Sequence, residues 1–108
     1  MLPAYSDTAP ERAELDARKG TLLLEFGSNE CGICRAATPL IAQSLTAHPD
    51  LPHLRIQDGK GRRLGRSFTV KLWPTLILMR DGEELGRVVR PQNVKELKAL
   101  IAQTERHA

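Results

Sequence analysis

The chain has 108 residues, of which 41% are hydrophobic, so it is long enough to bury one core and is predicted to be a single domain over residues 1–108. Its 16 Lys and Arg are largely matched by 13 Asp and Glu, and the densest basic run, residues 60–66, contains no aromatic residue. We therefore expect no nucleic-acid partner. Two cysteines are too few for a disulfide-stapled secreted scaffold, which points to a reducing, cytoplasmic setting.

The N-terminal segment has no apolar stretch with a basic flank, so neither a signal peptide nor a membrane partner is predicted. Residues 2–5 are expected to form a short edge strand. Thr8 and Glu11 then match the S/T-x-x-E pattern of a helix start. This helix is expected to run to about Arg18 and to end at Gly20, since glycine is the usual residue after a helix.

The first strong strand is predicted at residues 21–27, where a nearly continuous apolar run is typical of a central strand covered on both faces. Glu25 is the one acid within this run. It either lies on the less buried side of the strand or acts as a buried proton carrier behind the residues that follow.

Cys31 and Cys34 follow this strand at the start of a helical pattern, with two residues between them. Free backbone N–H groups and the helix dipole favour a thiolate at a helix N-terminus, so Cys31 is the predicted nucleophile. Cys34 lies about one turn further along the same face, where it can form and release a disulfide with Cys31 as the resolving cysteine. A strand that leads to such a pair indicates thiol–disulfide chemistry.

Two other interpretations of the cysteines are weaker. They could be buried structural residues that share this spacing by chance. A zinc site would need about four ligands, and the three histidines, His48, His53 and His107, are not spaced as a zinc pair. No metal and no organic cofactor are therefore predicted.

The remaining elements are predicted from apolar periodicity and turn residues. They are a helix from Cys31 to about Ala47 that Pro39 interrupts, a strand at 53–57, a short basic helix at 60–68, strands at 75–80 and 83–89 joined by an Asp81-Gly82 turn, and a last helix capped by Asn93. In the strand at 53–57, Leu54 and Ile56 are expected on one face and His53 and Arg55 on the other.

Five features in this order of elements carry a family resemblance. They are the Cys31-Gly32-Ile33-Cys34 pair, Pro39 five residues later, Glu25 six residues before Cys31, Trp73-Pro74-Thr75, and the Asp81-Gly82 hairpin before the final helix. With these features the chain resembles thioredoxin over nearly its whole length. The resemblance implies an α/β thioredoxin fold, in which a central mixed β-sheet of four to five strands is flanked by helices on both faces.

The resemblance also implies functional roles. Pro74 is expected to follow a cis peptide bond, and neighbouring backbone groups are expected to pair with an incoming substrate strand. The implied substrate-binding residues are Trp73, Pro74 and Thr75, together with Gly32 and Ile33 between the cysteines.

The chain departs from the usual family pattern at six positions around this region. The departures are Glu30 for Trp, Ile33 for Pro, Gly27 for an aromatic residue, Glu25 for Asp, His53 for Lys and Arg90 for Gly. They leave the reaction chemistry intact and alter the surface that meets partners. A thioredoxin-like protein with a narrower set of partners is therefore expected.

We predict an enzyme, a thiol–disulfide oxidoreductase that reduces protein disulfides through a Cys31/Cys34 cycle. Glu25 is expected to take or relay the Cys34 proton, with its pKa raised by burial above about 4.3. The expected partners are disulfide-containing proteins and an electron-donating reductase or small thiol, and a monomer is expected. Two alternatives stay open: a thiol oxidant or isomerase, and a thioredoxin-fold binding module or holdase whose CxxC is a redox switch.

Overall fold

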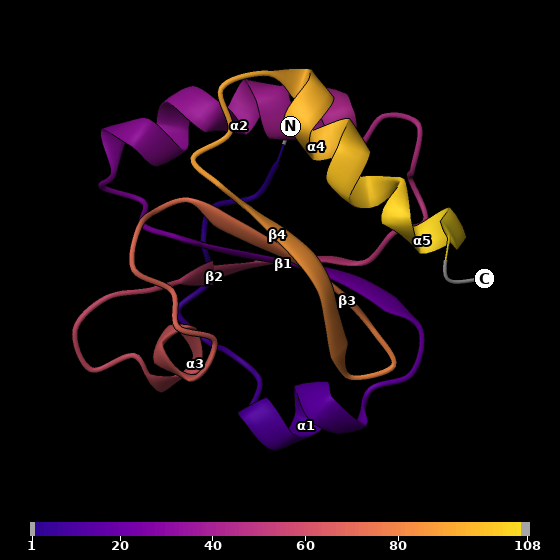
Figure 1. Cartoon of the computed structure of the whole chain (residues 1–108). Helices are drawn as coiled ribbons and strands as arrows, with labels where there is room; N and C mark the ends of the chain where they lie inside the picture. Colours follow the sequence, from indigo (N-terminus) through magenta and orange to yellow (C-terminus); the bar gives the residue numbers. More distant parts are fainter. Residues whose placement is uncertain (1, 107–108) are drawn as a thin grey trace.

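The computed structural model describes residues 2–106, and its centre is a mixed sheet of four strands in the order β2-β1-β3-β4 (Figure 1). The strands are β1 (Thr21–Gly27), β2 (His53–Gln57), β3 (Thr75–Arg80) and β4 (Glu83–Val89). β1 pairs with β2 in parallel and with β3 in antiparallel orientation, and β3 pairs with β4 in antiparallel orientation. All four strand ranges agree with the sequence prediction.

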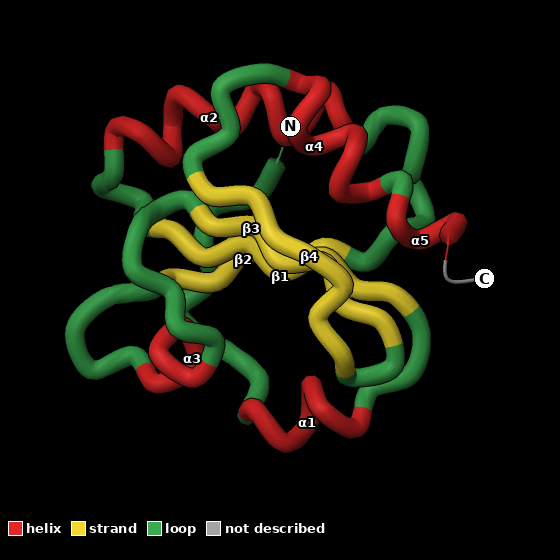
Figure 2. The backbone as a smooth tube through the Cα atoms, in the orientation of Figure 1, coloured by secondary structure: helices red, strands yellow, loops and turns green. Residues whose placement is uncertain are grey.

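Helices lie on both faces of this sheet. They are α1 (Arg12–Ala17), α2 (Gly32–Ser44), α3 (Arg63–Ser67), α4 (Val94–Ile101) and α5 (Gln103–Arg106). α2 and α4 lie over one face, and α1 and α3 lie over the other (Figures 1 and 2). The predicted α/β class and thioredoxin fold are confirmed. Within residues 2–106, none of these helices has the length and apolar composition needed to cross a membrane.

β1 is buried on both faces because alternate side chains enter two different cores. Leu22, Leu24 and Phe26 pack in the cluster on the α1 and α3 side. Leu23 packs in the cluster that includes Ile41 of α2 and the apolar face of α4. Glu25 shares the face of Leu23, so its carboxylate points into the layer beneath α2, and the interpretation of a less buried acid is wrong.

Several elements differ from the sequence prediction, among them α2, which continues through Pro39 without interruption and ends at Ser44. Instead of an edge strand at 2–5, the N-terminal segment makes one bridge, between Ser6 and Ile56 of β2. α1 begins later than expected, because Glu11 and Glu14 form the capping box rather than Thr8 and Glu11. The basic helix α3 is only five residues long. The N-terminal segment is still fixed to the β2 edge, since the Ser6 N–H donates to the Arg55 carbonyl at 2.8 Å.

Candidate active site

The end of β1 places Cys31 at the tip of α2. Cys31 is the N-cap residue, and its Sγ accepts a hydrogen bond from the backbone N–H of Cys34 at 3.3 Å. Both cysteines are free thiols; Cys31 is partly exposed, whereas Cys34 is 0% exposed. The structure therefore brings the two predicted cysteines together and makes Cys31 the thiol within reach of a substrate.

The two thiols differ in acidity. Burial disfavours the Cys31 thiolate and by itself would raise the Cys31 pKa. Hydrogen bonds outweigh this effect and lower the pKa below its ordinary value; they come from the Cys34 thiol and from the backbone of Cys34 and Ile33. The nearby charge of Arg90 lowers the pKa further. Burial and the hydrogen bond to Cys31 raise the pKa of Cys34 to about 11, although contacts with the Ser28 backbone and the Tyr5 side chain oppose this rise. Cys31 is thus the thiol that ionises first.

Glu25 is fully buried and lies in a cluster of three hydrogen-bond donors. The Tyr5 hydroxyl donates to Oε2, and His53 Nε2 lies 2.9 Å from Oε1. Arg55 donates from Nε to Oε1 and from Nη2 to Oε2, both at 3.0 Å. The parallel register opposes Glu25 to Arg55 across β1 and β2, which explains why the two side chains meet.

The expectation of a raised Glu25 pKa is wrong. Burial does raise it, but the hydrogen bonds from His53, Arg55 and Tyr5 outweigh burial and lower the pKa of Glu25 below its ordinary value. The expectation rested on burial alone and did not include the donors that face the carboxylate in the folded chain. With Arg55 beside it, the carboxylate is ionised at neutral pH.

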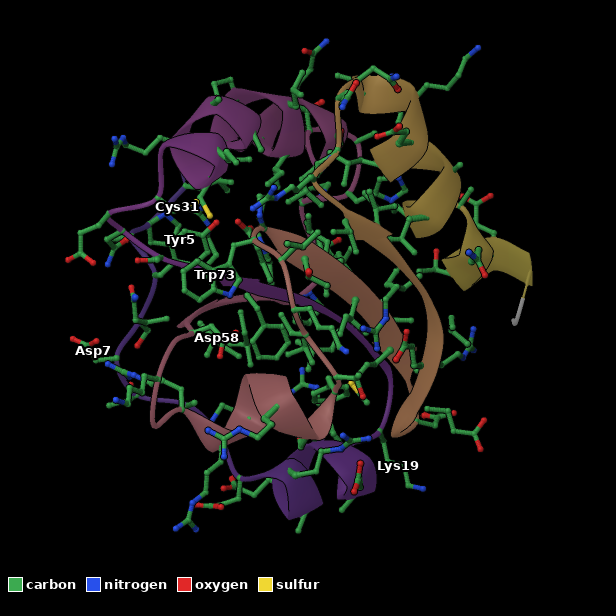
Figure 3. All side chains as sticks on the ribbon, turned by 60° about the vertical axis from the view of Figure 1, so that its left-hand side comes forward. Tyr5, Asp7, Lys19, Cys31, Asp58 and Trp73 are labelled. Atoms are coloured by element: carbon green, nitrogen blue, oxygen red, sulfur yellow. The ribbon has the colours of Figure 1, made fainter. Side chains whose placement is uncertain are left out.

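Tyr5 links this carboxylate to the cysteines. Its side chain lies in the space that a side chain at Gly27 would occupy. A β-carbon built on Gly27 would stand 2.6 Å from Tyr5 Oη and 2.9 Å from Cys34 Sγ, so both atoms border the same small space. Tyr5 and Cys31 lie at the same side of the molecule, with Trp73 nearby (Figure 3).

The Trp73–Pro74 peptide bond is cis, as the resemblance implied. The Trp73 indole N–H donates to Asp58 Oδ2 at 2.9 Å, and the Thr75 hydroxyl donates to the Leu72 carbonyl at 2.6 Å. Arg90 joins this loop to the end of β4: its N–H donates to the Pro74 carbonyl at 2.9 Å and its Nε to the Trp73 carbonyl at 2.8 Å.

Apolar side chains remain exposed on three segments of this end of the molecule. Ile33 is 46% exposed between the cysteines, Leu72 is 48% exposed in the loop before Pro74, and Val89 is 44% exposed at the end of β4, paired with Thr75. Gly32 is also exposed. Each of these side chains is therefore accessible from solvent.

Sequence reasoning missed two members of the site, Tyr5 and Arg55. Arg55 was expected on the same face as His53, but its approach to Glu25 depends on which residues of β1 and β2 stand opposite each other. Tyr5 is distant in sequence and lies in a segment with a thin apolar signal. One signal could have found it: Gly27, where the family usually has an aromatic residue, leaves room for a ring from elsewhere.

The fold and the site define a class of protein with a redox-active pair of cysteines. Residues 7–103 match the family model described as Thioredoxin. The solved structure of thioredoxin 2 from Pseudomonas aeruginosa PAO1, in its reduced form, is 47% identical, covers 100% of both chains and superimposes with a TM-score of 0.88.

Two relatives known by sequence are also thioredoxins. The thioredoxin of Chlamydia pneumoniae is 35% identical over 85 residues, which cover 76% of this chain and 80% of that protein. Thioredoxin-2 of Pyricularia oryzae is 32% identical over 81 residues, and the match spans 75% of this chain but 47% of that protein. The chain belongs to the thioredoxin family. Its family and fold are those of protein-disulfide oxidoreductases.

Proposed function

We propose that the chain reduces protein disulfides by a dithiol–disulfide cycle. The observation that carries this proposal is the asymmetry of the two thiols: Cys31 is accessible with a lowered pKa, and Cys34 is buried with a raised one. A thiolate is the attacking species in thiol–disulfide exchange, and a shielded second thiol favours intramolecular resolution over attack on another molecule.

In the first step the Cys31 thiolate attacks one sulfur of a substrate disulfide. The Cys31–substrate bond forms, and the other substrate sulfur leaves as a thiolate and takes up a proton. Cys34 then loses its proton and attacks Cys31 Sγ, which releases the second substrate thiol. The two electrons that reduce the substrate leave an oxidised Cys31–Cys34 disulfide.

For the substrate, we propose that the loop at Trp73, Pro74 and Thr75 holds an extended segment beside the cysteines, with Gly32 and Ile33 on the other side. The exposed apolar side chains of Ile33, Leu72 and Val89 support a docking surface there. Arg90 already donates to two carbonyls of this loop, so the side chain limits which partners fit.

Glu25 keeps its place in the proposal as carrier of the Cys34 proton, directly or through water. Its ionised form leaves it free to accept a proton, while the Arg55 pair makes that protonation costly. An electron-donating reductase or a small thiol would return the disulfide to the dithiol. We place this activity in the cytoplasm and expect a monomer to carry it.

The test is turbidimetric reduction of insulin by dithiothreitol, with wild type and Cys31→Ser measured side by side. Wild type should accelerate precipitation of the insulin chains, and Cys31→Ser should not exceed the rate with dithiothreitol alone. If wild type also fails to accelerate it, the chain is not a reductase, and a binding module that uses the CxxC as a redox switch becomes the better description.

A further inference from the structure

The resolving step has an unmet requirement. Cys34 must become a thiolate to attack Cys31, but it is 0% exposed and burial raises its pKa. A buried anion needs a hydrogen-bond donor within the protein. The structure offers one such side chain beside the Cys34 sulfur, and it comes from the N-terminal segment.

Tyr5 is held firmly in this position. The amide of Asn29, in the turn before Cys31, accepts from the Tyr5 N–H at 2.9 Å and donates to the Tyr5 carbonyl at 3.1 Å. On the ring, the guanidinium of Arg55 lies 4.2 Å from the centroid. Tyr5 is only 6% exposed, so its hydroxyl has to hydrogen-bond with buried groups of the protein.

The hydroxyl has two such partners. It donates to Glu25 Oε2, and it borders the same space beside Gly27 as Cys34 Sγ. Burial, together with the negative charge of Glu25, raises the pKa of Tyr5 above its ordinary value, so the phenol keeps its proton throughout the working pH range. The hydroxyl proton can point either to Glu25 or to the Cys34 sulfur, so Tyr5 can donate a hydrogen bond to one or the other.

We propose that Tyr5 is a catalytic residue of the resolving step, in which its hydroxyl turns from Glu25 to the Cys34 sulfur and donates to the thiolate as it forms. This inference rests on the proposed function and adds a residue to it. Glu25 tolerates the loss of this donor because Arg55 remains bound to both of its oxygens and His53 to Oε1.

The step balances as ordinary thiol exchange. The Cys34 proton leaves by way of Glu25 or water, and the sulfur electron pair forms the bond to Cys31 Sγ. The bond between Cys31 and the substrate sulfur breaks, and that sulfur keeps the electron pair and takes up one proton. Tyr5 gives up no proton overall, because its hydrogen bond is returned to Glu25 once the Cys31–Cys34 disulfide has formed.

The experiment is stopped-flow reaction of the reduced protein with an aromatic disulfide, 5,5′-dithiobis(2-nitrobenzoate), which needs no protein substrate. Attack by Cys31 and resolution by Cys34 each release one coloured thiolate, and a reagent concentration high enough to make the bimolecular attack the faster step separates the two rates in one trace. The variant is Tyr5→Phe, which keeps the ring and removes the hydroxyl. The matched control is Ser6→Ala, which removes the neighbouring hydroxyl, whose contacts are with Thr8.

Tyr5→Phe should slow resolution by about 10-fold at neutral pH, the scale of a lost hydrogen bond to a charged group. The pH at which resolution is half-maximal should rise by about one unit. Attack by Cys31 should change by less than about two-fold, and Ser6→Ala should change neither phase. Urea unfolding of both variants checks that each is folded at the assay temperature.

Three results would overturn the proposal: resolution by Tyr5→Phe at the wild-type rate, equal slowing of both phases, or slower resolution with an unshifted pH profile. The second would make Tyr5 a packing residue for the start of α2. Failure of the proposed function looks different, because wild type would then show both phases with the aromatic disulfide and yet leave insulin unreduced.

Discussion

Arg55 donates one hydrogen bond to each carboxylate oxygen of Glu25, both at 3.0 Å, and the two side chains are 5% and 0% exposed. Arg55 also donates to the Pro3 carbonyl and, at 3.1 Å, to the Thr38 hydroxyl. This pair therefore joins the N-terminal segment, β1, β2 and α2 directly beneath the cysteines. Its charge balance affects both stability and the acidity of the site.

Removing the cation should destabilise the fold strongly. Arg55→Met leaves Glu25 buried without its cation, and breaking a buried pair in this way costs about 3–5 kcal/mol. Urea unfolding at neutral pH measures the loss. The control is Arg62→Met, which breaks a more exposed pair with Asp7 and should cost at most about 1 kcal/mol. If both variants lost a similar amount of unfolding free energy, the buried Arg55–Glu25 pair would not stabilise the fold more than the exposed pair.

The same pair sets the pH dependence of stability. The Glu25 pKa is lowered in the folded protein, so its contribution to the unfolding free energy is present above the ordinary value of 4.5 and is lost as pH falls through the folded pKa. In Arg55→Met burial should dominate and raise that pKa. The Glu25 contribution to the unfolding free energy should then be lost as pH rises, so the slope of this free energy against pH has the opposite sign in the variant. Urea unfolding between about pH 2 and about pH 8 compares the two slopes, because the wild-type change lies below the ordinary pKa and that of the variant above it.

Glu25→Gln tests the proton carrier. The amide keeps the shape but cannot carry the Cys34 proton, so resolution of the mixed disulfide should slow while alkylation of Cys31 changes little. The unfolding free energy should also fall, because Arg55 is left as a buried, unpaired charge. The measurement is the resolution rate between about pH 6 and about pH 9. Profiles that superimpose on the wild type would reduce Glu25 to a structural partner of Arg55.

Alkylation should follow the order of the thiol pKa values. With limiting iodoacetamide, the label should appear on Cys31, which is accessible and ionises first, and not on Cys34. Peptide mapping by mass spectrometry locates the label. As a companion test, Cys34→Ser should accumulate mixed disulfides with substrate proteins and Cys31→Ser should not. Labelling mainly at Cys34 would reverse the assigned roles.

The reduction potential should lie above about −270 mV, the value typical of thioredoxin. Ile33 replaces the Pro that accompanies strongly reducing behaviour in the family, and the Arg90 charge favours the Cys31 thiolate and hence the reduced form. Equilibration with glutathione buffers measures the potential. Arg90→Gln should move it to a more negative value, whereas a wild-type potential at or below about −270 mV would count against the prediction.

The order of strands and helices and the position of the two cysteines at the start of α2 follow from local patterns. Each strand range was predicted from apolar runs and turn residues, and Asn93 caps α4 as expected, with its side chain accepting from the Glu96 N–H at 3.0 Å. The errors concern elements with weak local signals. Thr8 fits a capping pattern, but the α1 cap is Glu11, because a second pattern three residues on competes with it.

By itself, the sequence determined the strand–helix order, the Cys31–Cys34 spacing and the cis bond before Pro74 that the resemblance implied. The order of elements and the cysteine spacing depend on residues close to each other in the chain, where periodicity acts directly, whereas the cis bond was expected only from the family resemblance. The tertiary structure alone decided the partners of Glu25. Its pKa is lowered rather than raised because the β1–β2 register sets Arg55 opposite it and the N-terminal segment brings Tyr5 into the space left by Gly27. Electrostatic effects depend on distance in space. A sequence pattern that indicates burial, but not which charged groups lie nearby, therefore gives the wrong direction for the Glu25 pKa shift.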